Sequence, residues 1–354
     1  MHDIGAAHNL LAAMLDNRLH WQNRGPAKHG ANDPQIDGRS VEWGRVLDMN
    51  ERALRSVIVA LDPAGAGGNG VTRQSRFDIT VASEVMAILC LATDMGDLQR
   101  RLGNIVVGRS KATAAGDSQI VTAKDIGADG AMAALLRDAL QPNIVQSLEG
   151  NLGFVHGGPF ANIAHGCSTV LATKAAMAMG EYVVTEGGFG ADLGAEKFLN
   201  IKCRKSGIAP SAAVVVATTR ALKLHGGGDD AAAVAAGMPN LLRHCENLSK
   251  FGLPVVVAVN KFKTDTADEL DAIKSGCAAA GIDAIESTHW AHGGAGAADL
   301  AQAVVDVVEA GPTTPKLDFL YPDSMPLKEK LETLAREIYR ADGVAFSSQA
   351  ATKL

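Results

Sequence analysis

Residues 254–265 read Pro-Val-Val-Val-Ala-Val-Asn-Lys-Phe-Lys-Thr-Asp, an apolar run that ends on a polar turn. The run is apolar throughout and does not alternate, which is typical of a parallel strand covered on both faces. Similar runs, separated by Ala-rich stretches of helical length, lie at residues 104–107, 153–156, 181–185, 212–218 and 282–287. This order predicts an α/β protein with a mostly parallel sheet flanked by helices. Ligands of such sheets bind at the carboxyl ends of the strands.

The first part of the chain is less regular. It opens with a helical stretch to about Asn17, followed by a loop over about 25–39 that is rich in Gly, Asn, Asp and Pro. Helical sequence is predicted around 47–54 and again over 77–93, with an apolar run at 56–61 between them.

Composition excludes several classes of protein. The 354 residues are 47% hydrophobic, carry a net charge of -6 and contain no block of Lys and Arg, so no nucleic-acid partner is expected. No apolar run reaches the roughly eighteen residues that span a bilayer, and the first residues do not resemble a secretion signal. The five cysteines are odd in number and form no CxxC pair, which is typical of reduced thiols. We therefore expect a cytoplasmic protein without a membrane partner.

One glycine-rich loop resembles a phosphate-binding motif. Gly65, Gly67 and Gly70 spell GxGxxG after an apolar run, and the same stretch resembles a P-loop with Val71 in place of its lysine. Both motifs need a helix to begin at once, and residues 73–80 do not predict one. An ordinary surface loop is the preferred interpretation, and a dinucleotide-binding oxidoreductase is the alternative.

Two further Gly-rich turns follow predicted strands. Residues 154–166 predict a strand, a Gly-Gly-Pro turn and a helix that carries Asn162 and His165, which suit either an anion site or a tight turn with a core histidine. A metal site is not predicted, because His156 and His165 have no third ligand at suitable spacing. Residues 183–197 place Glu186, Asp192 and Lys197 around a turn that could hold a phosphate or a carboxylate, or could serve close packing.

Two aromatic side chains lie on loops after predicted strands. Phe262 follows Asn260 in a segment similar to the NKxD motif of GTPases, but Asp265 comes two positions too late. Trp290 lies in a Gly-rich loop, where its ring suits either a stacked heterocyclic ligand or a domain contact. The neighbouring His289 and His292 would share a helix face, but the glycines argue against a helix there.

Together these motifs resemble formate–tetrahydrofolate ligases. Residues 216–227, Val-Ala-Thr-Thr-Arg-Ala-Leu-Lys-Leu-His-Gly-Gly, resemble the family signature and depart from it at Thr219, where the family has Val or Ile. The resemblance covers nearly the whole chain and includes residues 77–86, 158–166, 185–197, 260–270 and the loop around Trp290.

The resemblance implies ATP-driven ligation of formate to N10 of tetrahydrofolate through formyl phosphate, a step of one-carbon metabolism. It implies ATP with Mg²⁺, formate and tetrahydrofolate as substrates, a monovalent cation as an optional addition, and no tightly bound cofactor. Family members form homotetramers, so self-association is expected. The chain would comprise an inserted α/β domain (1–120), the remainder of a P-loop NTPase-like large domain (121–240) and a truncated folate-side domain (241–354).

The resemblance also assigns site residues. Phe262 and Trp290 match the aromatic pair that sandwiches the pteridine, Tyr182 matches another aromatic of the folate site, and Lys263 replaces a Pro that is frequent in the family. The nucleotide and formyl-phosphate cleft would include Glu186, Phe189, Asp192, Asn162, His165 and Asn260.

Some family features have no counterpart. Neither a lysine-containing P-loop nor the GxKGGAAGGGY signature occurs in the 354 residues, and Glu149-Gly-Asn-Leu152 replaces Glu-Gly-Thr-Pro. The lysine that binds the γ-phosphate and the arginine that binds formyl phosphate are therefore unassigned, and no catalytic residue is predicted. Two hypotheses follow. The chain is a ligase completed by a part supplied elsewhere, or a non-catalytic remnant that binds folate or pairs with an intact ligase.

Overall fold

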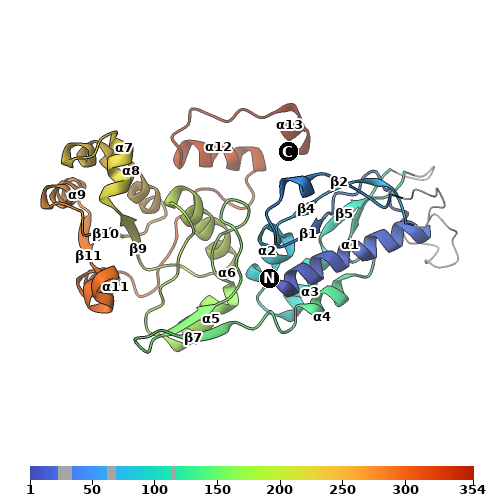
Figure 1. The fold of residues 1–354 in the computed structure, drawn as a ribbon, viewed down its shortest axis with the longest axis horizontal. Helices are drawn as coiled ribbons and strands as arrows, with labels where there is room; N and C mark the ends of the chain where they lie inside the picture. Colours follow the sequence, from blue (N-terminus) through green and yellow to red (C-terminus); the bar gives the residue numbers. More distant parts are fainter. Residues whose placement is uncertain (23–33, 62–68, 113–116) are drawn as a thin grey trace. The chain divides into compact units, whose positions relative to one another are not determined.

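A computed structural model describes residues 1–22, 34–61, 69–112 and 117–354 of the chain (Figure 1). They form two compact units, Met1–Glu186 and Gly187–Leu354, and each is described by itself. No described helix has both the length and the apolar character needed to cross a membrane.

The core of the first unit is helical. Helix α1 (His2–Gln22) buries Ile4, Leu11, Leu15 and Leu19 on one face, as the 3.6-residue period requires. It continues beyond the predicted end at Asn17. The other helices of this unit are α2 (Glu84–Leu91), α3 (Met95–Gly103), α4 (Asp129–Leu135) and α5 (Val170–Met179).

The strands of the first unit are short and pair two by two. Strand β1 (Arg45–Val46) pairs in parallel with β4 (Phe77–Asp78). The antiparallel pairs are β2 (Val57–Val59) with β3 (Arg73–Ser75), β5 (Val106–Arg109) with β6 (Ile120–Thr122), and β7 (Asn143–Gln146) with β8 (Leu152–Val155).

The prediction of a mostly parallel sheet is therefore wrong for the first unit. The runs at 57–59, 106–109 and 152–155 each pair with a strand adjacent in sequence, which needs only a short connection, whereas parallel pairing needs a crossover. Residues 181–185, predicted as a strand, have no strand assignment. Around 47–54 only a 3₁₀ turn at Arg52–Arg55 forms, and the helix predicted over 77–93 is interrupted before α2.

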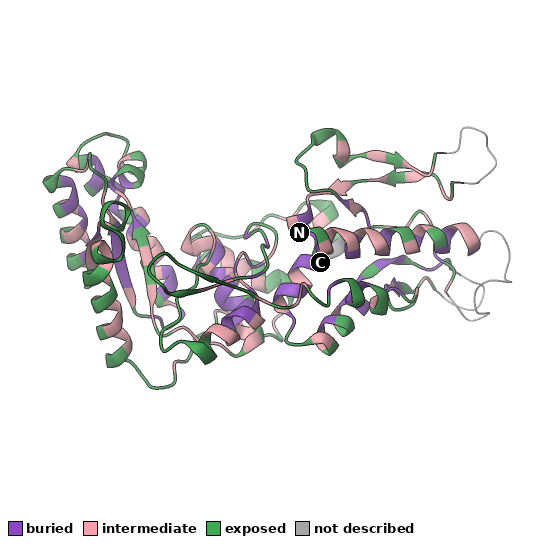
Figure 2. Cartoon of the chain, turned by 60° about the horizontal axis from the view of Figure 1, so that its bottom comes forward, coloured by how far each residue is buried: buried purple, intermediate pink, exposed green. Residues whose placement is uncertain are grey.

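The second unit contains the predicted parallel sheet. Strands β9 (Ala213–Ala217), β10 (Val255–Asn260) and β11 (Asp283–Ser287) run in parallel, as the sequence predicted, and their order in the sheet is β11-β10-β9. The central strand β10 is buried along most of its length (Figure 2). The helices between and after these strands are α7 (Thr219–Gly226), α8 (Ala231–Ser249), α9 (Ala267–Ala279), α10 (His289–His292) and α11 (Ala298–Ala310).

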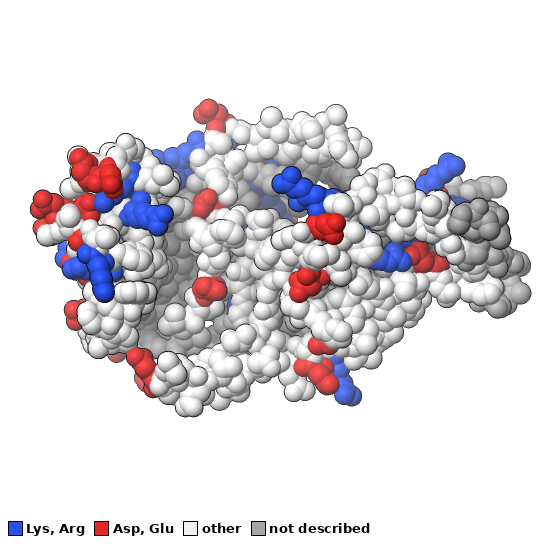
Figure 3. All heavy atoms as spheres, in the orientation of Figure 1, with Lys and Arg blue, Asp and Glu red and all other residues white. Residues whose placement is uncertain are grey.

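Outside this sheet the second unit is mainly helical. Residues Ala191–Ala195 and Phe198–Cys203 are wound as π-helix, followed by α6 (Arg204–Ser206). The C-terminal elements are α12 (Leu327–Glu337) and α13 (Ser348–Lys353). On the face seen in Figure 3, acidic and basic side chains are interspersed over this unit and form no continuous basic surface.

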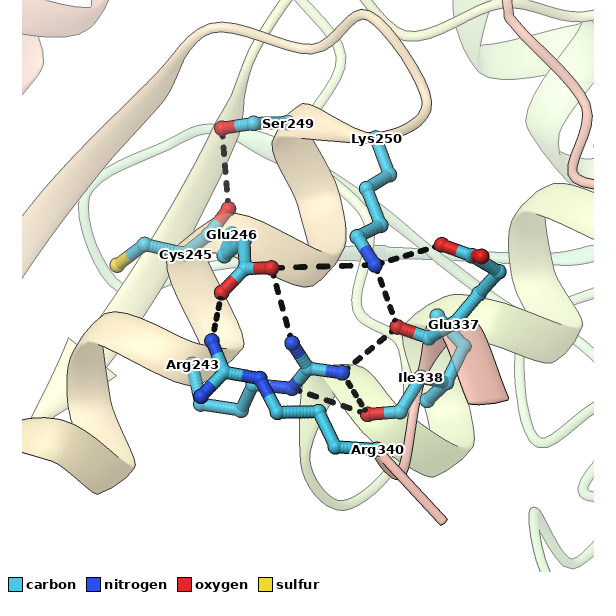
Figure 4. Close-up of polar contacts among 8 residues, drawn as sticks. All are labelled: Arg243, Cys245, Glu246, Ser249, Lys250, Glu337, Ile338 and Arg340. Atoms are coloured by element: carbon cyan, nitrogen blue, oxygen red, sulfur yellow. Dashed lines mark hydrogen bonds and ion pairs between the residues drawn. The ribbon is translucent and has the colours of Figure 1, made fainter. Parts of the chain in front are cut away.

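A polar cluster attaches the end of α12 to α8 (Figure 4). Arg243 of α8 donates to the carbonyls of Glu337 at 2.7 Å and of Ile338 at 2.8 Å. Lys250 donates to the same Glu337 carbonyl at 2.7 Å, and Glu246 accepts from Arg243 at 2.9 Å and also from Arg340. The last carbonyls of a helix have no partner within it, so these cations cap α12.

Candidate functional site

The carboxyl edge of the β9–β11 sheet brings two loops together. Asn260, the last residue of β10, is opposite Ser287, the last residue of β11. Phe262 lies two residues after β10, and Trp290 lies three residues after β11, on α10. Their side chains are 44% and 70% exposed, so neither aromatic is part of a core.

A carboxylate fixes the loop that carries Phe262. One oxygen of Asp265 accepts the backbone N–H of Phe262 at 2.8 Å, and the other accepts the hydroxyl of Thr219 at 2.6 Å. Asp265 N also donates to the carbonyl of Phe262 at 3.1 Å. The Asp that resembled a GTPase motif is therefore engaged within the fold. Sequence reasoning did not foresee this role of Thr219, although its departure from Val or Ile was a signal.

The loop that carries Trp290 is closed by a backbone contact. The N–H of Thr288 donates to the carbonyl of Gly296 at 2.8 Å, and a Cβ on Gly296 would lie only 2.6 Å from the Thr288 carbonyl carbon. The expectation that no helix forms here is wrong, because His289–His292 make one helical turn. His289 Nδ1 is bonded to Ser287 Oγ at 2.8 Å, and His292 Nδ1 to Thr288 Oγ1 at 3.0 Å.

Lys263 connects the two loops. Its ammonium nitrogen lies 5.6 Å from the centroid of the Trp290 ring, within the range of a cation–π contact. Lys263 has no carboxylate partner among the described residues, whereas nearby Lys261 is paired with Glu286 at 2.9 Å. The hydrogen bonds from Lys274 and Lys261 hold the pKa of Glu286 below its usual value.

Asn260 adds an unsatisfied acceptor to this edge. Its Oδ1 atom is buried and has no hydrogen-bond partner among the residues described. A buried acceptor without a partner is costly, so such an atom at a strand end suits an N–H donor from a ligand. Within the described part of the chain, no three His, Cys, Asp or Glu side chains are grouped to hold a metal ion.

The predicted residues of the first unit have different surroundings. Asn162 and His165 lie in a turn and not on a helix, because α5 begins only at Val170; Asn162 is exposed and His165 is buried. His156 has the environment of a core histidine, with its ring nitrogens 2.7 Å from Thr169 Oγ1 and from the carbonyl of Ala139.

The glycines of this turn serve close packing. Gly157 has a φ of +74°, and a Cβ there would lie 2.5 Å from Cys90 Sγ. Gly166 has a φ of +58°, and its Cβ would lie 2.2 Å from that of Ala161. This supports the tight turn that was one of the two interpretations.

The remaining candidates lie around residues 182–192. Tyr182 and Glu186 are exposed residues of the first unit. Phe189, in the second unit, has a φ of 65° and an exposed ring. Asp192 lies 3.7 Å from His244 Nδ1, and its carbonyl accepts the hydroxyl of Tyr339 at 2.9 Å. The predicted cleft therefore draws on residues of both units and stays a prediction.

The Gly65–Gly70 loop lies mostly outside the described residues. Gly70 is described and has a φ of +97°. The prediction that no helix follows is confirmed, because Arg73–Ser75 form strand β3. The helix N-terminus that either phosphate-binding interpretation requires is therefore absent after this loop.

Comparisons with known proteins agree with the sequence motifs. The family model described as formate–tetrahydrofolate ligase matches residues 1–354. Proteins named formate–tetrahydrofolate ligase from Paracoccus denitrificans and Granulibacter bethesdensis are 56% and 54% identical, over 98% and 97% of this chain. A protein of the same name from Maricaulis maris is 53% identical over 100% of this chain. The chain spans 60%, 58% and 61% of the length of these relatives. The chain belongs to the formate–tetrahydrofolate ligase family.

Proposed function

We propose that this chain binds tetrahydrofolate between Phe262 and Trp290 and takes part in its ATP-dependent ligation with formate. The products would be 10-formyltetrahydrofolate, ADP and phosphate, with formyl phosphate as the intermediate. The observation that carries the proposal is the placement of two exposed aromatic side chains after adjacent parallel strands, at the sheet edge where ligands gather. Family membership supplies the identity of the ligand.

The residues of this edge suit the parts of a folate. The rings of Phe262 and Trp290 offer flat apolar faces to a pterin, and such stacking contributes about 0.5–1.5 kcal/mol beyond burial of area. The buried Oδ1 of Asn260 could accept an N–H of the ligand. The ammonium group of Lys263 has no carboxylate partner in the described chain. It could pair with the carboxylates of the glutamate tail of tetrahydrofolate.

Family membership also supports an assignment of residues to the nucleotide side of the reaction. ATP with Mg²⁺ and formyl phosphate would contact residues from the set Asn162, His165, Glu186, Phe189, Asp192 and Asn260. Residues 121–240 would belong to the P-loop NTPase-like large domain of the ligase. A monovalent cation, Tyr182 as a further folate contact and a homotetrameric assembly complete the proposal.

Titration calorimetry with tetrahydrofolate tests the folate site. Trp290→Ala and Phe262→Ala should each weaken binding about 10- to 100-fold, because burying an aromatic side chain contributes roughly 1.5–3 kcal/mol. Phe160→Ala, which removes an exposed aromatic of the first unit, is the matched control and should leave affinity unchanged. Unchanged affinity in Trp290→Ala would refute this assignment and leave only family membership.

A non-catalytic folate-binding protein is the second candidate. It is favoured by the absence of a lysine-containing P-loop from the 354 residues. Loss of one preorganised donor to the reacting group typically costs about 10²–10³ in rate, so formate-dependent ADP release by this chain alone should be at least that much slower than for the Paracoccus relative. Equal turnover would show that the phosphate site lies elsewhere in this sequence.

A further inference from the structure

An ion pair joins α7 to the first turn of α9. Lys223 Nζ lies 2.6 Å from Glu269 Oε1, and the two side chains are 17% and 5% exposed. The hydrogen bond between them raises the pKa of Lys223 and lowers that of Glu269, so both groups are charged at neutral pH. Asp229 lies 3.3 Å from the same ammonium group but is 96% exposed, where ion pairs contribute little. Glu269 is therefore the main partner of Lys223.

Glu269 also caps the N-terminus of α9. Its Oε2 atom accepts the backbone N–H of Thr266 at 3.0 Å, and its own N–H donates to Thr266 Oγ1 at 3.4 Å, which makes a capping box. A cation beside a helix N-terminus is unfavourable, because that end of the helix carries a partial positive charge. The capping box is complete without Lys223, so α9 itself does not explain why a lysine is held here.

Two side chains on one face of α7 reach the Phe262 loop, which comprises residues 261–266. Thr219 and Lys223 are four residues apart and therefore lie on the same face of the helix. Thr219 donates to one oxygen of Asp265, and the other oxygen accepts the N–H of Phe262. Lys223 acts in the same way through Glu269, whose second oxygen accepts the N–H of the last residue of the loop. Each contact thus runs from α7 through a carboxylate to the backbone of the loop.

We propose that Lys223 is a positioning residue for the proposed folate site, which fixes the end of the Phe262 loop through Glu269. This role rests on the proposed function, because it concerns how Phe262 is presented to tetrahydrofolate. Replacement of a buried ion pair by apolar residues is often neutral or stabilising, so stability alone does not account for two nearly buried charges. A fixed distance between α7 and the loop does account for them.

Tetrahydrofolate affinity and amide hydrogen exchange of the free protein test this role. Lys223→Met and Glu269→Gln should each weaken tetrahydrofolate binding about 3- to 10-fold in titration calorimetry. Both should also speed exchange of the Phe262 N–H by about the same factor. Glu269→Gln retains the capping box, because its amide oxygen can accept the same N–H, so it removes the ion pair alone. Lys223→Arg keeps the charge and should retain the parent affinity and exchange rate.

Two controls separate this role from general stability. Asp229→Asn removes the exposed partner of the same lysine and should change neither affinity nor exchange. Arg243→Met loosens α12 in the same unit and should leave tetrahydrofolate affinity unchanged. An equal loss of affinity in Arg243→Met and Lys223→Met would assign the effect to general destabilisation and overturn the proposal. Circular dichroism checks that each variant is folded.

Amide exchange gives an answer that does not need the ligand. Exchange of the Phe262 N–H at the parent rate in both Lys223→Met and Glu269→Gln would show that the pair only joins two helices, and would overturn the proposal. Faster exchange with unchanged affinity would also overturn it, provided that Trp290→Ala still loses affinity. Failure of the proposed function is a different result, namely parent affinity in Trp290→Ala.

Discussion

The hydroxyl of Thr219, in the first turn of α7, donates to a carboxylate oxygen of Asp265 at 2.6 Å across 46 residues of sequence. Thr219 is buried, and the second oxygen of Asp265 accepts the backbone N–H of Phe262. One carboxylate therefore joins α7 to the loop that presents Phe262. We therefore expect the position of that ring to depend on the Thr219–Asp265 pair.

Replacement of Thr219 by Val removes this bond and keeps the side-chain shape. Because a hydrogen bond to a charged group contributes about 1.5–3 kcal/mol, urea denaturation should show a loss of that order in the free energy of unfolding. Tetrahydrofolate affinity should fall severalfold as the Phe262 loop loosens. Thr264→Val, an exposed position of the same loop, is the control. Equal effects in both variants would contradict a specific role of the Thr219–Asp265 bond.

The Arg243 cap of α12 gives a second prediction. Arg243→Met should cost about 1–3 kcal/mol of stability, because it leaves the carbonyls of Glu337 and Ile338 with fewer donors. Chymotrypsin should then cleave faster at Tyr339. Arg336→Met, at an exposed position of the same helix, should leave both the unfolding midpoint and the cleavage rate unchanged. Unchanged cleavage in Arg243→Met would show that the cap does not hold this segment.

His8 makes the stability of the first unit dependent on pH. Burial, aided by the charge of Arg76, lowers the pKa of His8 from 6.5 to about 4, against the opposing effects of the Gly44 backbone and Asp78. Its ring stacks on Trp43 and shares a hydrogen bond with Ser83 Oγ at 2.8 Å.

Because the folded protein keeps His8 neutral, protonation of His8 does not destabilise the fold above about pH 6.5. The free energy of unfolding falls as the pH drops from about 6.5 toward about 4, since the unfolded chain binds the proton more readily. One unit of pKa difference between the folded and unfolded states corresponds to about 1.4 kcal/mol, so the free energy of unfolding changes by up to about 3 kcal/mol over this pH range. Urea denaturation of His8→Gln should give a flatter pH profile over this range than the parent, and exposed His2→Gln should retain the parent slope. A parent slope in His8→Gln would assign the pH dependence to other groups.

The sequence predicts those segments of the structure whose conformation is set by residues nearby in the chain. It does not predict those that depend on contacts with distant residues. The runs that became β9, β10 and β11 were predictable, because each is apolar throughout and lies between helical stretches. Residues 181–185 have the same strand character but are not assigned as a strand, because strand formation also depends on the surrounding sheet. The turn at His289–His292 was missed, because its glycines disfavour a helix while the Thr288–Gly296 bond closes the loop. The departure from Val or Ile marked Thr219, but no local pattern could have identified its partner as Asp265, 46 residues away.

Lys263 gives the last prediction, which rests on the proposed folate site. Its ammonium group lies over the Trp290 ring, 5.6 Å from the centroid, and we expect a stacked pterin to use the same face. We expect the ligand to displace the ammonium group, which then attracts the glutamate carboxylates. Exposed ion pairs contribute about 0.2–1 kcal/mol, so Lys263→Met should weaken tetrahydrofolate binding about 1.4- to 5-fold at low salt and reduce its salt dependence.

A tetrahydropterin without the glutamate tail separates the two roles of Lys263. It has no carboxylate to attract, so Lys263→Met should leave its affinity unchanged or raise it by freeing the face of Trp290. The control is Lys316→Met, which removes a lysine elsewhere in the second unit and should change neither affinity. If Lys263→Met weakens the binding of both ligands equally, the side chain positions the loop and does not bind the glutamate tail. If it changes neither, Lys263 is not part of the site.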